Sequence, residues 1–390
     1  MYEYLSVPDF SCPGYLRYDI QDFVHAVIAR YYFNLYFGQE VQGHITGGNI
    51  VNKPLLIYNV HEIIQKTKPP GHRKISQKEP NMVQQIKNEM QRLGYKAEVI
   101  PASYFEYIRQ DAKALSECGF LNKYQERLVG NVFNFTLPDT EVRSIIIVAS
   151  PSPSTVMIKF YLKGKRIPLR IPSTYVDYNS APVAMEKCLN DLVNPAGYHV
   201  TSAQKLPKKW LAVRSGLGIY GRNNICYVDG FGSFATISAF YSDIPCAEGG
   251  LREIRQMEEC RTCKACLNNC PTAAIRPDRF LVDAERCLTY FNEADGGHDF
   301  PEWVDGSAHN SVVGCTRCQL ICPVNRKYIN DRSETFEFSE EETGILLSGG
   351  TFEQLPEELA QKIDKLNLRD YLSALPRNLK VLFSREDITA

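Results

Sequence analysis

Eight cysteines between residues 260 and 322 have the spacing of iron–sulfur ligands. The first block is a complete C-x2-C-x2-C-x3-C-P run, the pattern by which bacterial ferredoxins hold a cubane cluster. Its cysteines are Cys260, Cys263, Cys266 and Cys270. The second block, C-x2-C-x3-C-P, consists of Cys315, Cys318 and Cys322. Val312 stands where its first cysteine would be, so we expect Cys287, which lies between the blocks, to complete eight ligands for two 4Fe-4S clusters.

The fourth cysteine of such a run, before proline, ligates the neighbouring cluster. This crossing predicts a first cluster on Cys260, Cys263, Cys266 and Cys322. It predicts a second cluster on Cys270, Cys287, Cys315 and Cys318. Structural zinc is the alternative, because paired C-x2-C segments are also zinc ligands. Four cysteines within twelve residues that end in Cys-Pro suit a cubane better than a zinc ion.

The composition is that of a soluble globular protein. The chain has 390 residues, of which 44% are hydrophobic and 23% charged, and its formal net charge is −1. Near-neutral charge argues against indiscriminate binding to nucleic acid. The first residues lack a signal-peptide pattern, and no apolar run reaches the roughly 18 residues of a spanning helix. We therefore expect a cytoplasmic protein with reduced cysteines and no membrane partner.

The elements that must position these cysteines divide the chain into four predicted regions. An N-terminal region covers residues 1–101, with helices expected near 19–37 and 80–93 and strands near 53–60 and 95–100. A cofactor-binding region covers 102–245, and the cluster region covers 246–330. Residues 331–390 form a short acidic helical tail, which has seven Lys/Arg against thirteen Asp/Glu from residue 331 on. Helices are expected in this tail at 356–366 and 368–383.

The cofactor-binding region mixes helices and strands. Helical sequence runs from about 102 to 128, and an apolar strand follows at 144–150. A hairpin is expected from 156–162 and 167–171, and a helix from 181 to 193. The strands predicted at 225–228 and 233–240 flank Asp229-Gly-Phe-Gly232, which is typical of a hairpin turn.

Three glycines, Gly216, Gly218 and Gly221, lie between a predicted helix and a predicted strand. This order excludes a dinucleotide fingerprint, which opens a helix after a strand. Closely spaced glycines let a backbone approach a flat or bulky ligand, although a tight helix-to-strand turn would also use them. Residues 159–222 carry eleven Lys/Arg against three Asp/Glu, which suits a phosphate-bearing cofactor or substrate or else forms a solvated face.

The cysteine layout resembles that of the epoxyqueuosine reductases, cobalamin-dependent enzymes with two 4Fe-4S clusters that are distantly related to reductive dehalogenases. The resemblance covers roughly 144–325, with a weak echo at Leu375-Pro-Arg377-Asn378. The flanking segments that agree are Thr272–Ile275, Val282–Tyr290, Gly314–Asn325, Gly216–Gly218, Gly221–Asn223 and Gly232–Phe234. It implies an α+β protein in which an α/β domain of the cobalamin-binding type precedes a ferredoxin-like double-cluster domain.

The resemblance also implies site residues. The family's proton-donating aspartate lies in an Asp-Tyr-His segment, which Asp177-Tyr178 matches, although the third residue here is Asn179. On sequence alone Asp177 could equally be a turn or capping residue ahead of the next helix. Cobalamin contacts are implied for Tyr178, Gly216, Gly218, Gly221, Arg222, Asn223 and Ser233.

The implied activity is a cobalamin-dependent reduction that removes oxygen or halogen, with Asp177 as proton donor and an external donor of the ferredoxin or flavodoxin type. The chain is a divergent member: its first hundred residues differ from the family's start, and Thr201 replaces an aspartate. The helical-repeat domain that holds tRNA is absent or reduced to the acidic tail, so tRNA is only a candidate substrate. The alternatives are a ferredoxin-like electron carrier without an organic substrate and a cobalamin-handling protein.

Overall fold

The computed structural model describes residues 81–384 except 118, 120, 134–136, 139–140 and 248–249. The helix predicted over 19–37 and the strand predicted over 53–60 lie outside the described residues. The helix and strand predicted at 80–93 and 95–100 are confirmed as α3 (Met82–Arg92) and β1 (Lys96–Pro101). The boundary drawn after residue 101 stays a prediction, although β1 pairs with a strand beyond it.

The larger sheet has four strands in the order β1-β2-β8-β5. Its further strands are β2 (Ser144–Pro151), β8 (Ala235–Ser242) and β5 (Val200–Ser202). All three pairings are antiparallel, whereas the strands of an α/β domain are mostly parallel. The broader prediction of a mixed α+β protein is confirmed.

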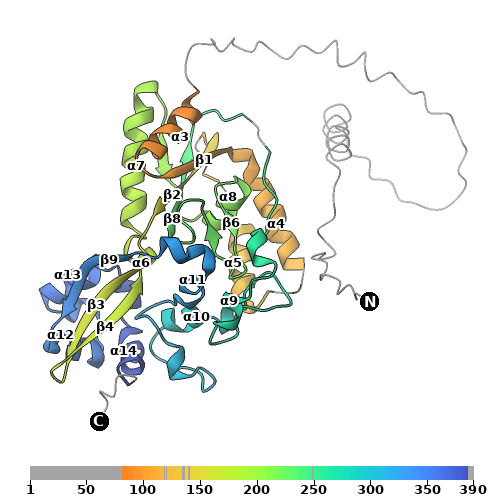
Figure 1. Ribbon diagram of the computed structural model, residues 1–390. Coiled ribbons are helices and arrows are strands. Elements are labelled where there is room, and N and C mark those ends of the chain that lie inside the picture. Colours follow the sequence, from red (N-terminus) through yellow and green to blue (C-terminus); the bar gives the residue numbers. More distant parts are fainter. Residues whose placement is uncertain are drawn as a thin grey trace, which may run out of the picture. The chain divides into compact units, whose positions relative to one another are not determined.

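Helices cover both faces of this sheet, so its apolar strand β2 is buried on both sides (Figure 1). Ile146 of β2 belongs to the core formed with α3 and α7, and Ile147 belongs to the core formed with α4 and α8. Neighbouring side chains point to opposite faces of a strand, which explains the continuous run of isoleucine and valine. The remaining helices on these faces are α7 (Ser180–Val193), α4 (Phe105–Glu117) and α8 (Lys208–Arg214).

The helical sequence expected from 102 to 128 forms α4 and α5 (Lys123–Phe133), which pack against each other. The hairpin predicted around Asp229 is wrong in its pairing. β7 (Cys226–Tyr227) pairs with β6 (Ile219–Tyr220), while β8 joins the larger sheet. The turn itself forms through a bridge between Val228 and Gly232. The predicted turn is therefore confirmed, but β8 pairs with the distant strand β2, so β7 and β8 lie in different sheets.

The smaller sheet has the order β4-β3-β9. β3 (Thr155–Leu162) and β4 (Lys165–Pro172) form the predicted hairpin, which is confirmed. β9 (Asp331–Phe338) runs parallel to β3, so the region predicted as a helical tail also contains a strand. This pairing brings Arg332 next to the start of the hairpin.

Three helices pack on the smaller sheet: α12 (Glu340–Ser348), α13 (Glu357–Lys365) and α14 (Leu375–Ser384). Figure 1 shows them gathered around β3, β4 and β9. Phe160 of β3 and Phe338 of β9 stack with their ring centroids 4.8 Å apart, at the centre of a shared core. The segment after residue 331 thus completes a second hydrophobic core and is not a solvated appendage.

The cysteine blocks lie in a region of short helices and turns, which suits ligands that must converge on one point. Its helices, with η marking the 3-10 type, are η3 (Glu258–Cys260), α9 (Ala265–Asn268), η4 (Ala284–Arg286), α10 (Leu288–Glu293), η5 (Gly306–Ala308), α11 (Arg317–Leu320) and η6 (Pro323–Tyr328). None of the described helices is long and apolar enough to cross a bilayer.

Candidate iron–sulfur centre and adjoining pocket

The first group of thiols gathers around Cys266, in α9. Burial raises the pKa of the Cys266 thiol to about 11, and the nearby thiols of Cys260, Cys322 and Cys263 add to that rise in pKa. Such mutual effects require thiols at short range. The structure therefore brings together the four cysteines predicted to hold the first cluster, although Cys322 lies 56 positions beyond Cys266 in the sequence.

The second group gathers around Cys287, between η4 and α10. Burial raises the pKa of the Cys287 thiol, and the thiols of Cys315 and Cys270 contribute to it. Burial also raises the pKa of Cys318 well above its usual value, with contributions from Cys315, Cys287 and Cys266. Because the Cys266 thiol of the first group affects the pKa of Cys318, the two groups are neighbours.

Hydrogen-bond donors point at the sulfur atoms of both groups. The backbone N–H of Arg222 donates to Cys260 Sγ at 3.3 Å, and Asn310 Nδ2 donates to Cys315 Sγ at 3.2 Å. Donors of this kind stabilise thiolates and tune iron–sulfur clusters. The donor set, two groups of cysteine thiols with N–H donors at their sulfurs, is of the kind that holds 4Fe-4S clusters.

The glycine loop packs against β7, the short strand that follows it. A Cβ at Gly221 would lie 2.5 Å from the Tyr227 ring, and one at Gly218 would overlap Cys226 Sγ. The side chain of Asn223 is buried and donates to the Tyr227 hydroxyl at 3.1 Å. Glycine is therefore required here because other parts of the protein lie too close for a side chain. From the sequence alone, these glycines could have served either a bound ligand or a tight turn.

Ser233 is buried and bonded within the protein. Its hydroxyl lies 2.9 Å from Gln319 Oε1, and its backbone N–H donates to Asn325 Oδ1 at 2.9 Å. Gln319 lies within the second cysteine block, and Asn325 lies just after it in η6. Of the residues predicted to contact cobalamin, Tyr178 and Gly216 are the exposed ones. Tyr178 keeps 49% of its surface exposed, and Lys208 Nζ lies 4.6 Å from its ring centroid.

Asp177 follows the short helix α6 (Ser173–Val176) and is bound by an arginine. Arg332 Nη2 donates to Asp177 Oδ1 at 2.7 Å and to Oδ2 at 2.9 Å. The side chains of Asp177 and Arg332 are 19% and 26% exposed. The N-cap of α7 is Asn179. Asp177 is thus a turn residue and the C-cap of α6, as the alternative allowed, but its carboxylate binds Arg332 and does not cap α7.

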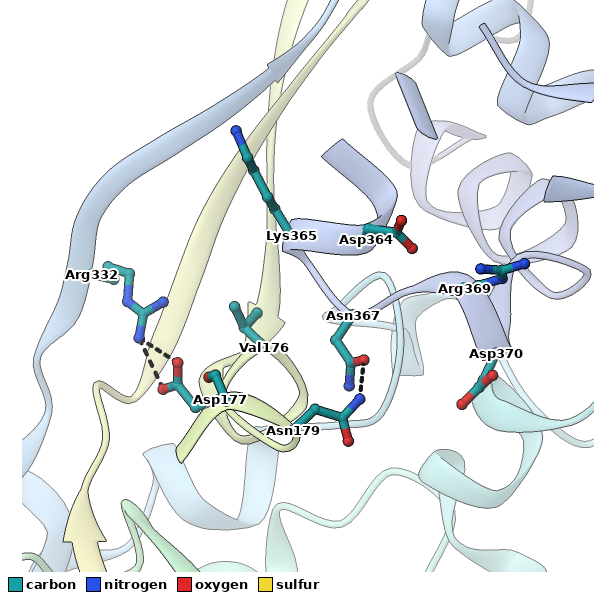
Figure 2. Close-up of a pocket in the computed structure, with 10 residues that line it drawn as sticks. Val176, Asp177, Asn179, Arg332, Asp364, Lys365, Asn367, Arg369 and Asp370 are labelled. Carbon is teal, nitrogen blue, oxygen red and sulfur yellow. Dashed lines mark hydrogen bonds and ion pairs between the residues drawn. The ribbon is translucent and has the colours of Figure 1, made fainter. Parts of the chain in front are cut away.

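A pocket of about 550 Å³ opens beside this ion pair. Figure 2 shows Asp177 and Arg332 on one side and Lys365, Arg369 and Asp370 on the other. Asn179 Nδ2 donates to Asn367 Oδ1 at 2.7 Å, which ties the loop after α6 to the segment after α13. The lining carries both charges and amides, so it suits a polar ligand.

Tyr175, in α6, connects this pocket to the second thiol group. Its hydroxyl donates to Glu293 at the end of α10, and a Cβ at Gly314 would lie 2.5 Å from the Tyr175 hydroxyl oxygen. Gly314 directly precedes Cys315. Burial raises the pKa of the Tyr175 hydroxyl and of the Glu293 carboxyl. The segment that carries Asp177 is therefore in contact, through Tyr175, with the segments that carry the second thiol group.

Sequence reasoning missed Arg332, Tyr175 and Asn310. Arg332 lies 155 positions after Asp177, in a segment predicted to be helical, and no local pattern pairs the two. Tyr175 is two residues from Asp177 and resembles many buried tyrosines. Asn310 is the one with a local signal, because a polar side chain five residues before Cys315 is well placed to donate to its sulfur.

Comparison with known proteins agrees with this centre. Residues 259–325 match the family described as a 4Fe-4S double cluster binding domain. Three curated relatives are epoxyqueuosine reductases: those of Atelocyanobacterium thalassa (31% identical over 121 residues), Leadbetterella byssophila (33% over 159) and Xanthomonas campestris (36% over 138). These alignments cover 31%, 38% and 34% of this chain and 38%, 50% and 36% of the relatives. The chain thus spans half or less of their length.

Solved structures with the same name share the fold. An epoxyqueuosine reductase with an epoxyqueuosine-modified tRNA-Tyr stem loop aligns with a TM-score of 0.56 at 17% identity, over 78% of this chain and 82% of that one. The Streptococcus thermophilus enzyme aligns with a TM-score of 0.55 at 18% identity, over 79% and 82%. The prediction of a double-cluster region and the resemblance to epoxyqueuosine reductases are confirmed for the matched part of the chain.

Proposed function

We propose that this chain is an iron–sulfur reductase of the epoxyqueuosine reductase type, which removes oxygen, or a halogen, from a polar substrate bound beside Asp177. The observation that carries the proposal is the link between the second thiol group and a polar pocket, which Tyr175 makes through Glu293 and Gly314. A bare electron carrier would need the thiol groups but no such pocket.

The first cluster is held by Cys260, Cys263, Cys266 and Cys322 in this proposal. The second is held by Cys270, Cys287, Cys315 and Cys318. The grouping of the thiols and the donors at Cys260 and Cys315 support this crossed assignment. When bound, the clusters supply single electrons and a cobalamin supplies the reducing centre at the substrate. We also propose the finer fold description, a cobalamin-type domain followed by a ferredoxin-like one.

Cobalamin contact is proposed for Tyr178, which has an exposed ring beside the pocket loop. Gly216 is exposed as well and stays a candidate. Arg222, Asn223 and Ser233 bond to the cysteine blocks, which suits a framework role. Gly218 and Gly221 pack on Cys226 and Tyr227, which suits the same role. The shape of the loop would then serve the cofactor, while only the exposed positions touch it.

Asp177 is proposed to hold and deliver the proton that the substrate takes up. A general acid must reach the reacting atom, and a carboxylate bound twice by Arg332 is not free to do so. The ion pair must therefore open, or Arg332 must be drawn to the substrate, before the proton is transferred. Asn179 and Asn367 are placed at the pocket to orient polar groups of the substrate.

The proposed substrate is the modified base carried by tRNA, because a relative of the same fold has been solved with such a stem loop. The Lys/Arg excess of residues 159–222 supports contact with phosphates. Binding should then weaken steeply with salt, since each neutralised phosphate releases counterions. A filter-binding series from low to physiological salt tests this, and no binding of the modified tRNA at low salt would exclude a tRNA substrate. The electron donor is proposed to be a ferredoxin or flavodoxin.

Anaerobic reconstitution with iron, sulfide and cobalamin tests the whole proposal. We expect about eight irons, four per cluster, and about one cobalt per chain. Iron without cobalt would favour the electron-carrier alternative. Cobalt bound without turnover on any epoxyqueuosine substrate would favour a cobalamin-handling protein. Zinc in place of iron would overturn the cluster assignment.

A further inference from the structure

Arg222 lies against the ligand loop of the first thiol group at several points. Its Nε donates to the carbonyl oxygen of Cys263 at 3.0 Å, and its Nη2 donates to the carbonyl oxygens of Cys260 and Arg261. Its backbone N–H donates to Cys260 Sγ at 3.3 Å. The guanidinium group of Arg222 therefore holds the loop from Cys260 to Cys263, and its backbone N–H bonds to the sulfur of Cys260.

The loop is built to bring Arg222 to this position. A Cβ at Gly221 would lie 2.5 Å from the Tyr227 ring, so Gly221 packs directly on Tyr227. Tyr227 and Cys260 share a small buried cluster, against which Cys322 packs. Asn223 donates to the carbonyl oxygen of Cys318 at 3.4 Å. The chain from Gly221 to Tyr227 thus lies between the two cysteine blocks.

We propose that Arg222 is a positioning residue of the first cluster and raises its reduction potential. Reduction adds negative charge to a cluster, so a fixed guanidinium beside its ligands favours the reduced state. An N–H donated to a ligand sulfur acts in the same direction.

This inference rests on the proposed ligand assignment but needs neither the cobalamin nor the substrate. The exposed neighbour Arg261 provides the matched control. Arg261 belongs to the same loop, but its side chain is 77% exposed and pairs with Glu258 at 2.8 Å. Solvent screens such a charge, so its removal should affect the cluster far less.

The test is an EPR-monitored potentiometric titration of the reconstituted full chain. The first-cluster signal is identified as the one that Cys263→Ser alters. For Arg222→Gln we expect retained iron and a reduction equilibrium of this signal that is at least about tenfold less favourable, which for one electron corresponds to about 59 mV. The second-cluster signal should move much less. Arg222→Lys keeps the charge and should stay closer to the wild-type potential than Arg222→Gln.

Three results would overturn the inference. The first is a wild-type potential in Arg222→Gln. The second is an equal shift in Arg261→Gln, which would make the effect one of general surface charge. The third is an Arg222→Lys potential as low as that of Arg222→Gln, which would remove the role of the charge. If instead Cys263→Ser alters the signal of the cluster that Arg222→Gln leaves unchanged, the ligand assignment stands and the role of Arg222 fails.

Discussion

Arg332 binds both carboxylate oxygens of Asp177 through a single nitrogen, at 2.7 and 2.9 Å. Asp177 follows α6, and Arg332 lies in β9. Both lie near one end of the smaller sheet, because the last residue of β4 and the first residue of β9 both pair with Thr155 of β3. The neighbouring Asp331 accepts hydrogen bonds from Ser154 and Thr155, which fixes the start of β9 beside β3. The position of the proposed proton donor is therefore set by a strand from the end of the chain.

Replacing Asp177 by asparagine should abolish proton delivery while leaving the clusters in place. We expect turnover to fall about 10²- to 10⁴-fold, the usual contribution of a general acid. Iron content and EPR signals should match the wild type. Asp364→Asn is the control, because Asp364 lines the same pocket away from the Arg332 pair. Equal losses in both variants would mean that pocket charge, and not a specific acid, is responsible.

The pairing of Asp177 with Arg332 should appear as an energetic coupling. A double-mutant cycle with Asp177→Asn and Arg332→Gln is expected to give a coupling of about 0.5–3 kcal/mol, the range for groups in contact. Anaerobic denaturant unfolding of the wild type, both single variants and the double variant measures it. Purely additive effects would show that the ion pair contributes nothing in solution.

Asn378 of α14 should be essential for the stability of the cluster region. Its buried side chain donates to the carbonyl oxygens of Asn292 and Val312, each at 2.9 Å. Asn378→Leu would leave these two acceptors unpaired, at a cost of about 1–3 kcal/mol for each buried group. Lys380→Ala, on the exposed side of the same helix, should change the unfolding free energy by about 0.5 kcal/mol or less. If Asn378→Leu changed the unfolding free energy no more than the control does, these two hydrogen bonds would not stabilise the cluster region.

Cys226 should resist alkylation up to mildly alkaline pH. Burial raises the pKa of its thiol to about 12, and only 4% of the residue is exposed. Because the thiolate is the reactive form, a raised pKa keeps the group neutral until the pH approaches that value. Iodoacetamide at pH 8 with peptide mass spectrometry should modify the partly exposed Cys188 long before Cys226. Equal labelling would show that the glycine loop opens readily.

Stacked rings should dominate the stability of the smaller core. Phe160 and Phe338 are almost fully buried and nearly parallel, at 8° between ring planes. Phe338→Ala should cost about 3–5 kcal/mol through lost burial and the cavity left behind. Chemical unfolding measures this loss, and a cost below that range would mean that the segment after residue 331 is not part of the core.

Local sequence determined much of the fold. The hairpin of β3 and β4, the apolar strand β2 and helix α7 follow from alternation, turn residues and helical spacing, which act over short distances. The sequence analysis missed β9 and wrongly paired β7 with β8, because β9 and β8 pair with strands far away in the chain, β3 and β2. A strand's partner is chosen by tertiary packing, which no short window contains.

The cysteine spacing by itself determined the chemistry, since ligand intervals are a local property and eight thiols with this pattern suit two cubanes. Only the tertiary structure decided what surrounds them. It turned the glycine loop and Arg222 toward the cysteine blocks and bound Asp177 to Arg332. These relationships join residues 41 and 155 positions apart, and they exist because the folded chain brings charges and hydrogen-bond partners together where sequence distance no longer matters.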